Sequence, residues 1–187
     1  MPFRSCDAVV SNVGPVATID LLDADLDAAY VAEIRRLAKP TANFIIHVAS
    51  DQPLLDTPGL IVFSSTERVC NAGNLTATCP ELAPEGKHLT VVYAVPRPAV
   101  GDFDVDGELE LAIEELHCEL PGGEIIDARA MHGDWPAQRA LAGYEMPRET
   151  PLPNLWNVGD GVRDYGSGGT QACAETARDV VAALLGD

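Results

Sequence analysis

The residues best suited to chemistry lie near the end of the sequence, in a glycine-rich loop between a short apolar run and a helical pattern. The loop, residues 159–169, holds five glycines in eleven positions and begins Gly159-Asp160-Gly161. Because glycine has no Cβ, backbone N–H groups in such a loop can closely approach an anionic or carbonyl oxygen. Asp160 follows directly on the apolar run, where its carboxylate could accept hydrogen bonds from sugar hydroxyls.

The residues after the loop add to this chemistry. Gly168-Gly169 lead into Thr170-Gln171, the expected first turn of a helix. A helix N-terminus presents unpaired N–H donors and about half a positive charge. We therefore expect the segment to bind a phosphate or an electron-rich ring carbonyl. A strand, loop and helix that only close a sheet would explain the same pattern without a ligand.

A dinucleotide fingerprint is a near miss in this loop. The spacing G-x-G-x-x-G would need glycine at Gln171, or in the earlier frame at Asp164. It would also need a later strand with an acidic residue ~20 positions further on, and the sequence ends at Asp187. We therefore expect that no Rossmann unit begins here.

Around the loop, alternation and turn residues predict a mixed α/β (α+β) fold. Strands are expected over 6–12, 43–49, 60–64, 88–95, 124–130 and 154–158, helices over 17–38, 107–120 and 170–185, and a connecting loop over 135–150. The links between the middle strands are mostly too short for helical crossovers, so their sheet should be largely antiparallel.

Apolar residues recur at helical spacing in each predicted helix. The expected buried stripes are Leu26, Tyr30, Ile34 and Leu37 in the first helix, Leu109, Ile113, Leu116 and Leu120 in the second, and Cys173, Ala177, Val180 and Leu184 in the third. These stripes predict which helix faces cover the sheet.

Composition excludes several classes of function. The 187 residues carry a formal charge of −17, which disfavours nucleic acid as a partner. Five cysteines without C-x-x-C spacing and four scattered histidines predict no metal site and a reducing, cytoplasmic location. No apolar run approaches the ~20 residues of a membrane span, although peripheral contact with a membrane stays open.

Two segments near the end of the sequence resemble a known motif. Residues 154–161 and 169–177, with the glycine loop between them, resemble the carboxyl-terminal flavin-binding motif of FAD-dependent oxidoreductases, most closely the phytoene desaturase and carotenoid isomerase group, with the amine oxidases more distant. Residues 7–15, 82–88 and 135–139 are similar to further parts of that group in the same order. The resemblance thus covers nearly the whole chain.

The resemblance implies a set of FAD-binding residues: Gly159, Asp160, Gly161, Gly168, Gly169, Thr170 and Gln171. Gly159 and Asp160 would approach the ribityl chain and pyrophosphate, and the turn after Gly169 would direct N–H groups at the pyrimidine edge of the flavin. The sequence departs from the motif at Ser167 and at Cys173-Ala174. No catalytic residue is assigned.

The resemblance also implies a domain organisation. Residues 1–15 would be a strand and exit loop of the FAD domain, residues 16–134 a substrate domain, and residues 135–187 a connecting loop with the closing FAD unit. Members of the family open with a G-x-G-x-x-G half that this sequence lacks. We expect a carboxyl-terminal fragment or subunit that alone binds FAD weakly or not at all, and that pairs with an amino-terminal partner or self-associates.

The implied reaction is hydride removal from, or isomerisation of, a hydrophobic polyene-like substrate. An alternative is a catalytically silent protein that acts by protein association or by binding an apolar ligand. His132 with Asp134 could form an acid–base pair, although a loop histidine beside an aspartate is more often structural.

Overall fold

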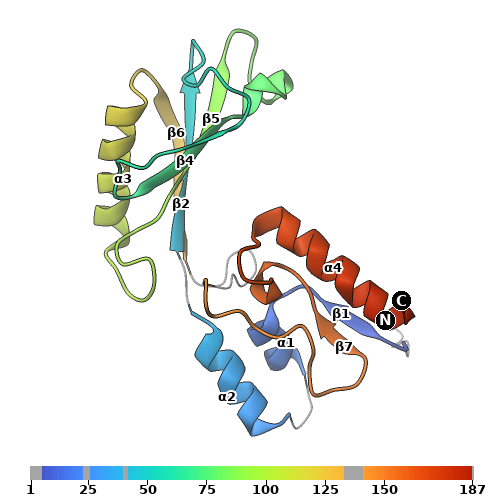
Figure 1. The fold of residues 1–187 in the computed structure, drawn as a ribbon. Helices are drawn as coiled ribbons and strands as arrows, with labels where there is room; N and C mark the ends of the chain where they lie inside the picture. Colours follow the sequence, from blue (N-terminus) through green and yellow to red (C-terminus); the bar gives the residue numbers. More distant parts are fainter. Residues whose placement is uncertain (1–5, 23–25, 40–41, 133–140, 187) are drawn as a thin grey trace. The chain divides into compact units, whose positions relative to one another are not determined.

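The computed structural model describes residues 6–22, 26–39, 42–132 and 141–186. The chain divides into two compact units, one formed by Met1–Pro40 with Gly133–Asp187 and the other by Thr41–His132 (Figure 1). The domain boundary predicted at residue 16 therefore falls inside the first unit. The naming of the units as FAD and substrate domains stays a prediction.

The first unit is built on two parallel strands from opposite ends of the sequence. β1 (Val9–Ser11) pairs with β7 (Leu155–Asn157), with Val10 opposite Trp156. The other elements of this unit are α1 (Pro15–Leu21), α2 (Ala28–Leu37), the 3₁₀ turn η3 (Asp160–Val162) and α4 (Gly169–Leu185). In Figure 1, α4 (red) lies along one side of the strand pair and α1 and α2 (blue) lie on the other.

The single helix predicted over residues 17–38 is wrong, because the structure has two helices there. Leu22, which follows α1, has an extended backbone with φ −84° and ψ 124°. Asp27 then begins α2 by accepting a hydrogen bond from the N–H of Ala29 at 2.9 Å. An aspartate in this position satisfies one of the free donors of a new helix. The predicted apolar stripe is confirmed, with Ile34 and Leu37 buried.

The second unit is a five-stranded sheet with one long helix. The strands lie in the order β3–β4–β5–β2–β6 and every neighbouring pair is antiparallel. Their bounds are β2 (Ala42–Ser50), β3 (Leu60–Val62), β4 (Val69–Asn74), β5 (His88–Ala94) and β6 (Glu124–His132), with 3₁₀ turns η1 (Leu75–Ala77) and η2 (Pro80–Leu82) and helix α3 (Val105–Glu119). The predicted fold class, with its largely antiparallel sheet and closing strand-loop-helix, is confirmed.

Strand β4 was not predicted from the sequence. Asn71, Gly73 and Asn74 are residue types that favour turns over strands. The strand forms because β3 and β5 pair with its two edges. Its place in the sheet is therefore set by contacts that lie outside its own residues.

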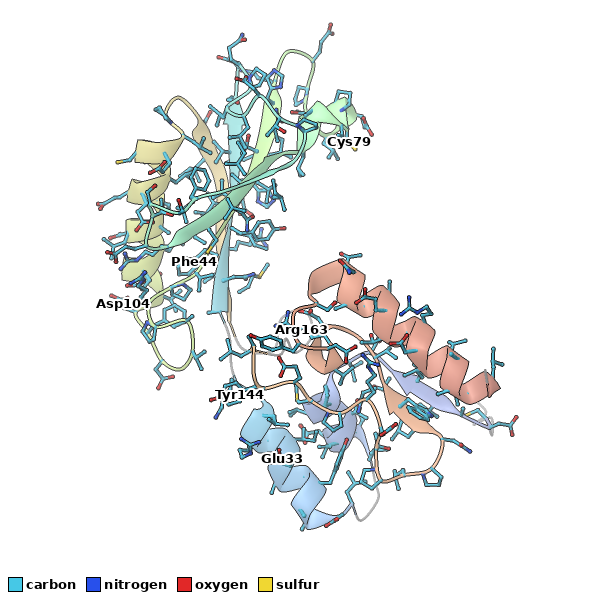
Figure 2. All side chains as sticks on the ribbon, viewed as in Figure 1. Glu33, Phe44, Cys79, Asp104, Tyr144 and Arg163 are labelled. Carbon is cyan, nitrogen blue, oxygen red and sulfur yellow. The ribbon has the colours of Figure 1, made fainter. Side chains whose placement is uncertain are left out.

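Alternation along β2 places the core between the sheet and α3. Phe44, Ile46 and Val48 are buried, and Ile45 and His47 between them are only partly buried on the opposite face. The ring of Phe44 meets that of Phe103 edge to face at 6.2 Å, and Figure 2 shows it between the sheet and α3. The predicted α3 stripe packs in this cluster. Burial of these side chains is the main stabilising contribution to the unit.

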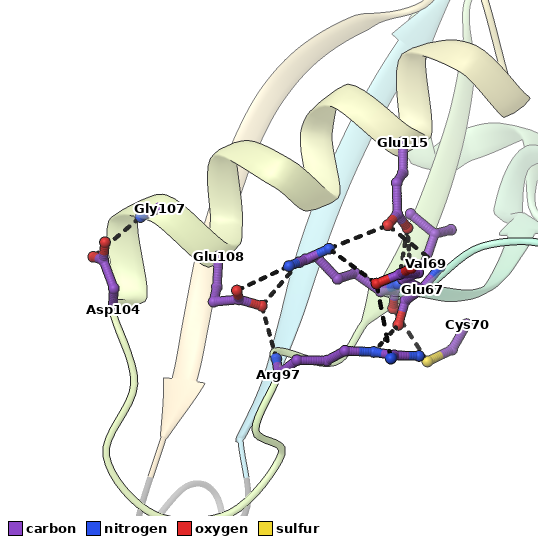
Figure 3. Close-up of polar contacts among 9 residues, drawn as sticks. Glu67, Val69, Cys70, Arg97, Asp104, Gly107, Glu108 and Glu115 are labelled. Carbon is purple, nitrogen blue, oxygen red and sulfur yellow. Dashed lines mark hydrogen bonds and ion pairs between the residues drawn. The ribbon is translucent and has the colours of Figure 1, made fainter.

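An ionic cluster fastens α3 to the start of β4 (Figure 3). The carboxylate of Glu115 accepts hydrogen bonds from the backbone N–H groups of Arg68 at 2.8 Å, Val69 at 3.0 Å and Glu67 at 3.3 Å. The Arg68 guanidinium binds the carboxylate of Glu108 at 2.8 Å, and the Arg68 side chain is only 14% exposed. One helix face thereby holds the turn between β3 and β4.

The surroundings shift the pKa of both carboxyl groups downward. Burial alone would raise the pKa of Glu115, but the three backbone N–H groups and the Arg68 guanidinium together outweigh it and lower that pKa. The pKa of Glu108 is lowered chiefly by its hydrogen bond from Arg68. Both groups therefore stabilise the folded state as anions.

This cluster predicts acid-sensitive stability. A carboxyl group whose pKa is lowered on folding contributes stability that is present above its unfolded pKa of about 4.3 and is lost as pH falls through the folded value. The free energy of unfolding of the second unit should therefore fall as pH drops below about 5. Denaturant titrations at a series of pH values measure this, and Glu115→Gln should flatten the dependence.

The matched control is Glu114→Gln, one residue earlier on the exposed side of α3. It should keep the wild-type dependence on pH. Equal slopes for Glu115→Gln and the wild type would show that the Glu115 cluster does not contribute.

Candidate functional site

The glycine-rich loop leaves β7 and returns to the start of α4, and its first residue is held against that helix. The N–H of Val158 donates to the carbonyl of Ser11 on β1 at 2.8 Å. The next N–H, that of Gly159, donates to Oγ1 of Thr176 at 2.8 Å. Thr176 is 1% exposed, and its hydroxyl also lies 3.2 Å from the carbonyl of Cys173. The end of β7 and helix α4 are thus joined at the first residue of the loop.

Asp160 closes the other end of the loop. Its Oδ1 accepts a hydrogen bond from the N–H of Gly169, the first residue of α4, at 2.8 Å. The side chain is 15% exposed and lies 3.9 Å from the Arg163 guanidinium. A carboxylate at this position interacts favourably with the positive end of the helix dipole. Asp160 therefore caps α4, and its predicted contact with sugar hydroxyls stays a prediction.

Backbone geometry requires two of the predicted glycines, and a third lies close to an arginine side chain. Gly159 and Gly169 have φ values of 111° and 59°, which residues with a side chain rarely adopt. A Cβ on either one would meet no atom within 4 Å, so both border open space. A Cβ on Gly168 would lie 2.8 Å from Nη1 of Arg163. Gly159 and Gly169 thus leave room for a ligand, whereas Gly168 leaves room for an arginine.

The other predicted residues lie beside these glycines. Gly161 is buried in η3, and Thr170 and Gln171 are exposed in the first turn of α4. The first backbone hydrogen bond of this helix runs from Ala172 to the carbonyl of Gly168 at 3.4 Å. The N–H groups of Thr170 and Gln171 precede it and have no acceptor within the helix. The structure brings the predicted site residues together in one loop and one helix start.

This arrangement fits part of the FAD that the family resemblance implies. The start of α4 offers N–H donors and positive potential, and the open space beside Gly159 and Gly169 leaves room for oxygens to approach. The departure at Ser167 is accommodated, because its hydroxyl donates to Glu175 at 2.7 Å. Hydrogen bonds from Gln171 and then Ser167 lower the pKa of Glu175. This carboxylate thus orders the loop and the first turn.

A buried polar cluster sets the position of the strand end from below. Oγ1 of Thr18 on α1 lies 2.9 Å from Oδ1 of Asn157, 2.9 Å from the carbonyl of Gly14 and 2.7 Å from Oγ of Ser11. Thr18 and Asn157 are 4% and 0% exposed. Burial raises the pKa of Tyr30, and a hydrogen bond with Asn157 opposes the shift. Because buried polar groups are costly to leave unpaired, this cluster fixes α1 against β7.

Several residues that shape the site were missed by sequence reasoning. Arg148 binds the loop from a position distant in the sequence, and Arg163 binds it from within the turn. The residue type alone does not indicate that either arginine has this role. Thr176 left a signal, because it is a polar residue four positions from both Ala172 and Val180. These three are the buried residues of α4.

The predicted buried face of α4 is therefore partly wrong. Val180 is buried, but Cys173 is exposed and Leu184 is 37% exposed. The helix is turned toward the face that bears Thr176, because its hydroxyl binds Gly159.

Other candidate features give no site in the parts of the chain that the structure describes. Asp134 and the side chain of His132 lie outside the described residues, so this pair stays a prediction. Among the described residues, no three His, Cys, Asp or Glu side chains are placed to hold a metal ion. In the same residues, no helix combines the length and apolar character needed to cross a bilayer.

Comparison with known proteins yields a relative by sequence and several by structure. The sequence matches no protein-family model. It is 24% identical over 167 residues to an uncharacterised protein of Methanocaldococcus jannaschii, covering 86% of this chain and 38% of that protein. The structure superimposes on the crystal structure of an oxidoreductase from Methanosarcina mazei with TM-score 0.82 and 31% identity, covering 95% of this chain and 43% of that one.

Two further solved structures share the fold. The crystal structure of a protein from Pyrococcus furiosus superimposes with TM-score 0.78 and 22% identity, and the match covers 97% of this chain and 41% of that one. The crystal structure of a reduced UDP-galactopyranose mutase superimposes with TM-score 0.64 and 14% identity, and the match covers 98% of this chain and 42% of that one. The fold is one found in oxidoreductases. The chain spans only about two fifths of the length of these relatives.

The bond between Gly159 and Thr176 predicts a stability effect. Thr176→Val keeps the shape of the side chain but removes the acceptor of the Gly159 N–H, which should destabilise the first unit by about 1–3 kcal/mol. Chemical denaturation followed by Trp156 fluorescence measures this. Thr170→Val, at an exposed position of the same helix, is the control and should change stability by less than about 0.5 kcal/mol. Equal effects of the two substitutions would show that the hydrogen bond between Gly159 and Thr176 does not stabilise the unit.

Proposed function

We propose that this chain supplies the carboxyl-terminal part of the FAD site of an oxidoreductase. The observation that carries the proposal is the pair of glycines with positive φ, Gly159 and Gly169, which border open space beside the start of α4. The structural similarity to an oxidoreductase of Methanosarcina mazei supports it. The narrower placement with phytoene desaturases rests on the sequence motif alone.

The proposed roles follow from the local chemistry. When bound, FAD would supply the hydride acceptor. The N–H groups of Thr170 and Gln171 would donate to oxygen atoms of the cofactor, and the positive end of the α4 dipole would stabilise negative charge on the ring. Asp160 already accepts a hydrogen bond from the N–H of Gly169. Its carboxylate would orient the neighbouring N–H donors of α4 and would accept hydrogen bonds from ribityl hydroxyls.

We further propose that another polypeptide segment, in the same protein or in a partner subunit, completes the site. A two-stranded sheet is marginal alone, and in the part of the chain that the structure describes the sheet of the first unit holds only β1 and β7. Val9 and Val10 of β1 are 47% and 46% exposed, which leaves β-branched side chains available for contact. The relatives carry more than half of their length outside the region matched here. FAD should therefore bind weakly or not at all to this chain alone.

The proposed substrate is a hydrophobic, polyene-like small molecule. In the second unit, Leu60 and Val62 of β3 are 65% and 75% exposed on the sheet face away from α3, which is consistent with an apolar ligand. All five cysteines are free thiols, in keeping with the expected cytoplasmic location. The alternative, a silent protein that acts by association, is favoured by exposed Val181 and Leu185 on α4.

Reconstitution tests the proposal. The part of the Methanosarcina mazei oxidoreductase that this chain does not match would be expressed together with this chain, and the purified complex examined for flavin absorbance near ~450 nm. Stoichiometric flavin in the complex and little in either part alone is the expected result. A complex that forms but never holds flavin would support the silent alternative.

The role of Asp160 makes a further prediction. In the flavin-bound complex, Asp160→Ala should weaken FAD binding by about 1.5–3 kcal/mol, the scale of a hydrogen bond to a charged group. Equilibrium dialysis of FAD measures this. Asp20→Ala is a matched control, because Asp20 lies on α1 with its side chain 56% exposed and pairs with Arg35. Unchanged affinity for Asp160→Ala would remove this carboxylate from the site.

A further inference from the structure

Arg148 lies before β7 in the sequence, yet its guanidinium binds the glycine-rich loop and α4 together. Nη2 donates to Asp164 in the loop at 2.6 Å, and Nε donates to the carbonyl of Val162 at 3.3 Å. Nη1 donates to Asp179 on α4 at 3.1 Å. The side chain thus spans the outgoing limb of the loop and the helix that the loop leads into.

The backbone of Arg148 is itself fixed to β7. Its carbonyl accepts from the N–H of Asn157 at 2.7 Å, and Glu149 forms an antiparallel bridge with Trp156. The guanidinium therefore projects from a backbone that is hydrogen-bonded to β7. Strand, loop and helix meet at this one side chain.

Burial and geometry make the contact effective. The Arg148 side chain is 22% exposed and Asp179 34% exposed, so water screens their attraction only in part, whereas Asp164 is 75% exposed and its attraction to Arg148 is screened more strongly. The planar guanidinium offers several donors in fixed directions, and here three of them reach different partners. A lysine has a single terminal nitrogen and could not span the same set.

We propose that Arg148 is a positioning residue, which orders residues 160–168 before any ligand arrives. This inference rests on the proposed function, because the ordered loop is the one that places Gly159 and Gly169 beside open space. A loop that is already ordered loses less conformational entropy on binding. Arg148 would thus increase affinity for the cofactor without touching it.

Limited proteolysis tests the ordering without any cofactor. Between Arg148 and Arg178, Arg163 is the one site for trypsin, and it lies inside the loop. Cleavage after Arg163 needs the loop to open, since its guanidinium also donates to the carbonyl of Ser167 at 2.8 Å. Arg148→Gln should be cleaved there about tenfold faster than the wild type, and Arg148→Lys at an intermediate rate.

The matched control is Arg178→Gln. Arg178 pairs with the same Asp179 but is 74% exposed, and its hydrogen bonds to that carboxylate stay within α4. Its loss should leave cleavage after Arg163 at the wild-type rate. Cleavage after Arg129 in the second unit serves as an internal standard. If Arg148→Gln does not fold, Asp164→Asn, which removes one partner only, should still accelerate cleavage. Wild-type rates in both variants would overturn the proposal.

A second measurement separates this inference from the proposed function. In the reconstituted complex, Arg148→Gln should raise the FAD dissociation constant about tenfold, because a loop that is not ordered beforehand loses more conformational entropy on binding. A merely destabilised protein would bind FAD at a lower stoichiometry, with the dissociation constant of the wild type. If the wild-type complex holds no FAD while the difference in cleavage remains, the proposed function fails and the role of Arg148 in the loop stands.

Discussion

The candidate site depends on one short-range constraint, the hydrogen bond by which the carboxylate of Asp160 holds the N–H of Gly169. It joins the first residues of the loop to the first residue of α4. The eight positions between them must therefore form a closed turn, and glycines with positive φ make this turn feasible. The bond from Gly159 to Thr176 and the Arg148 contacts hold the turn against the rest of the unit. The donors of the helix start are exposed as a consequence.

The net charge of the chain explains why backbone N–H groups, and not basic side chains, are available to bind an anion at the loop. The chain carries −17 overall, and the two arginines near the loop, Arg148 and Arg163, are bound to carboxylates or carbonyls of the chain itself. An approaching phosphate therefore meets an acidic surface with its local cations engaged. N–H dipoles at a helix start attract an anion without adding a mobile cation. Under the proposed function, further positive charge would come from the segment that we propose completes the site.

The elements that sequence predicted well are those with a strong local pattern. The α3 stripe, the β-branched run of β2 and the strand-loop-helix at residues 154–185 follow from spacing and from glycine, which act within a few residues. The break between α1 and α2 was missed because residues 22–27 hold no glycine or proline, and Asp27, which begins the new helix, is one of three aspartates there. Strand β4 and the role of Arg148 were missed because partners distant in sequence create them.

The parallel pairing of β1 with β7 has a consequence for how the chain folds. Thr18 and Asn157, which join α1 to β7, are 139 positions apart in the sequence, whereas the paired strands of the second unit join residues that are closer together in the sequence. Contacts between residues that are far apart in the sequence form late in folding, because closing the loop costs chain entropy before the contact contributes any favourable free energy. The second unit, once folded, shortens the effective distance between the two halves of the first. Folding kinetics should thus be sequential, with the candidate site as the last structure to assemble.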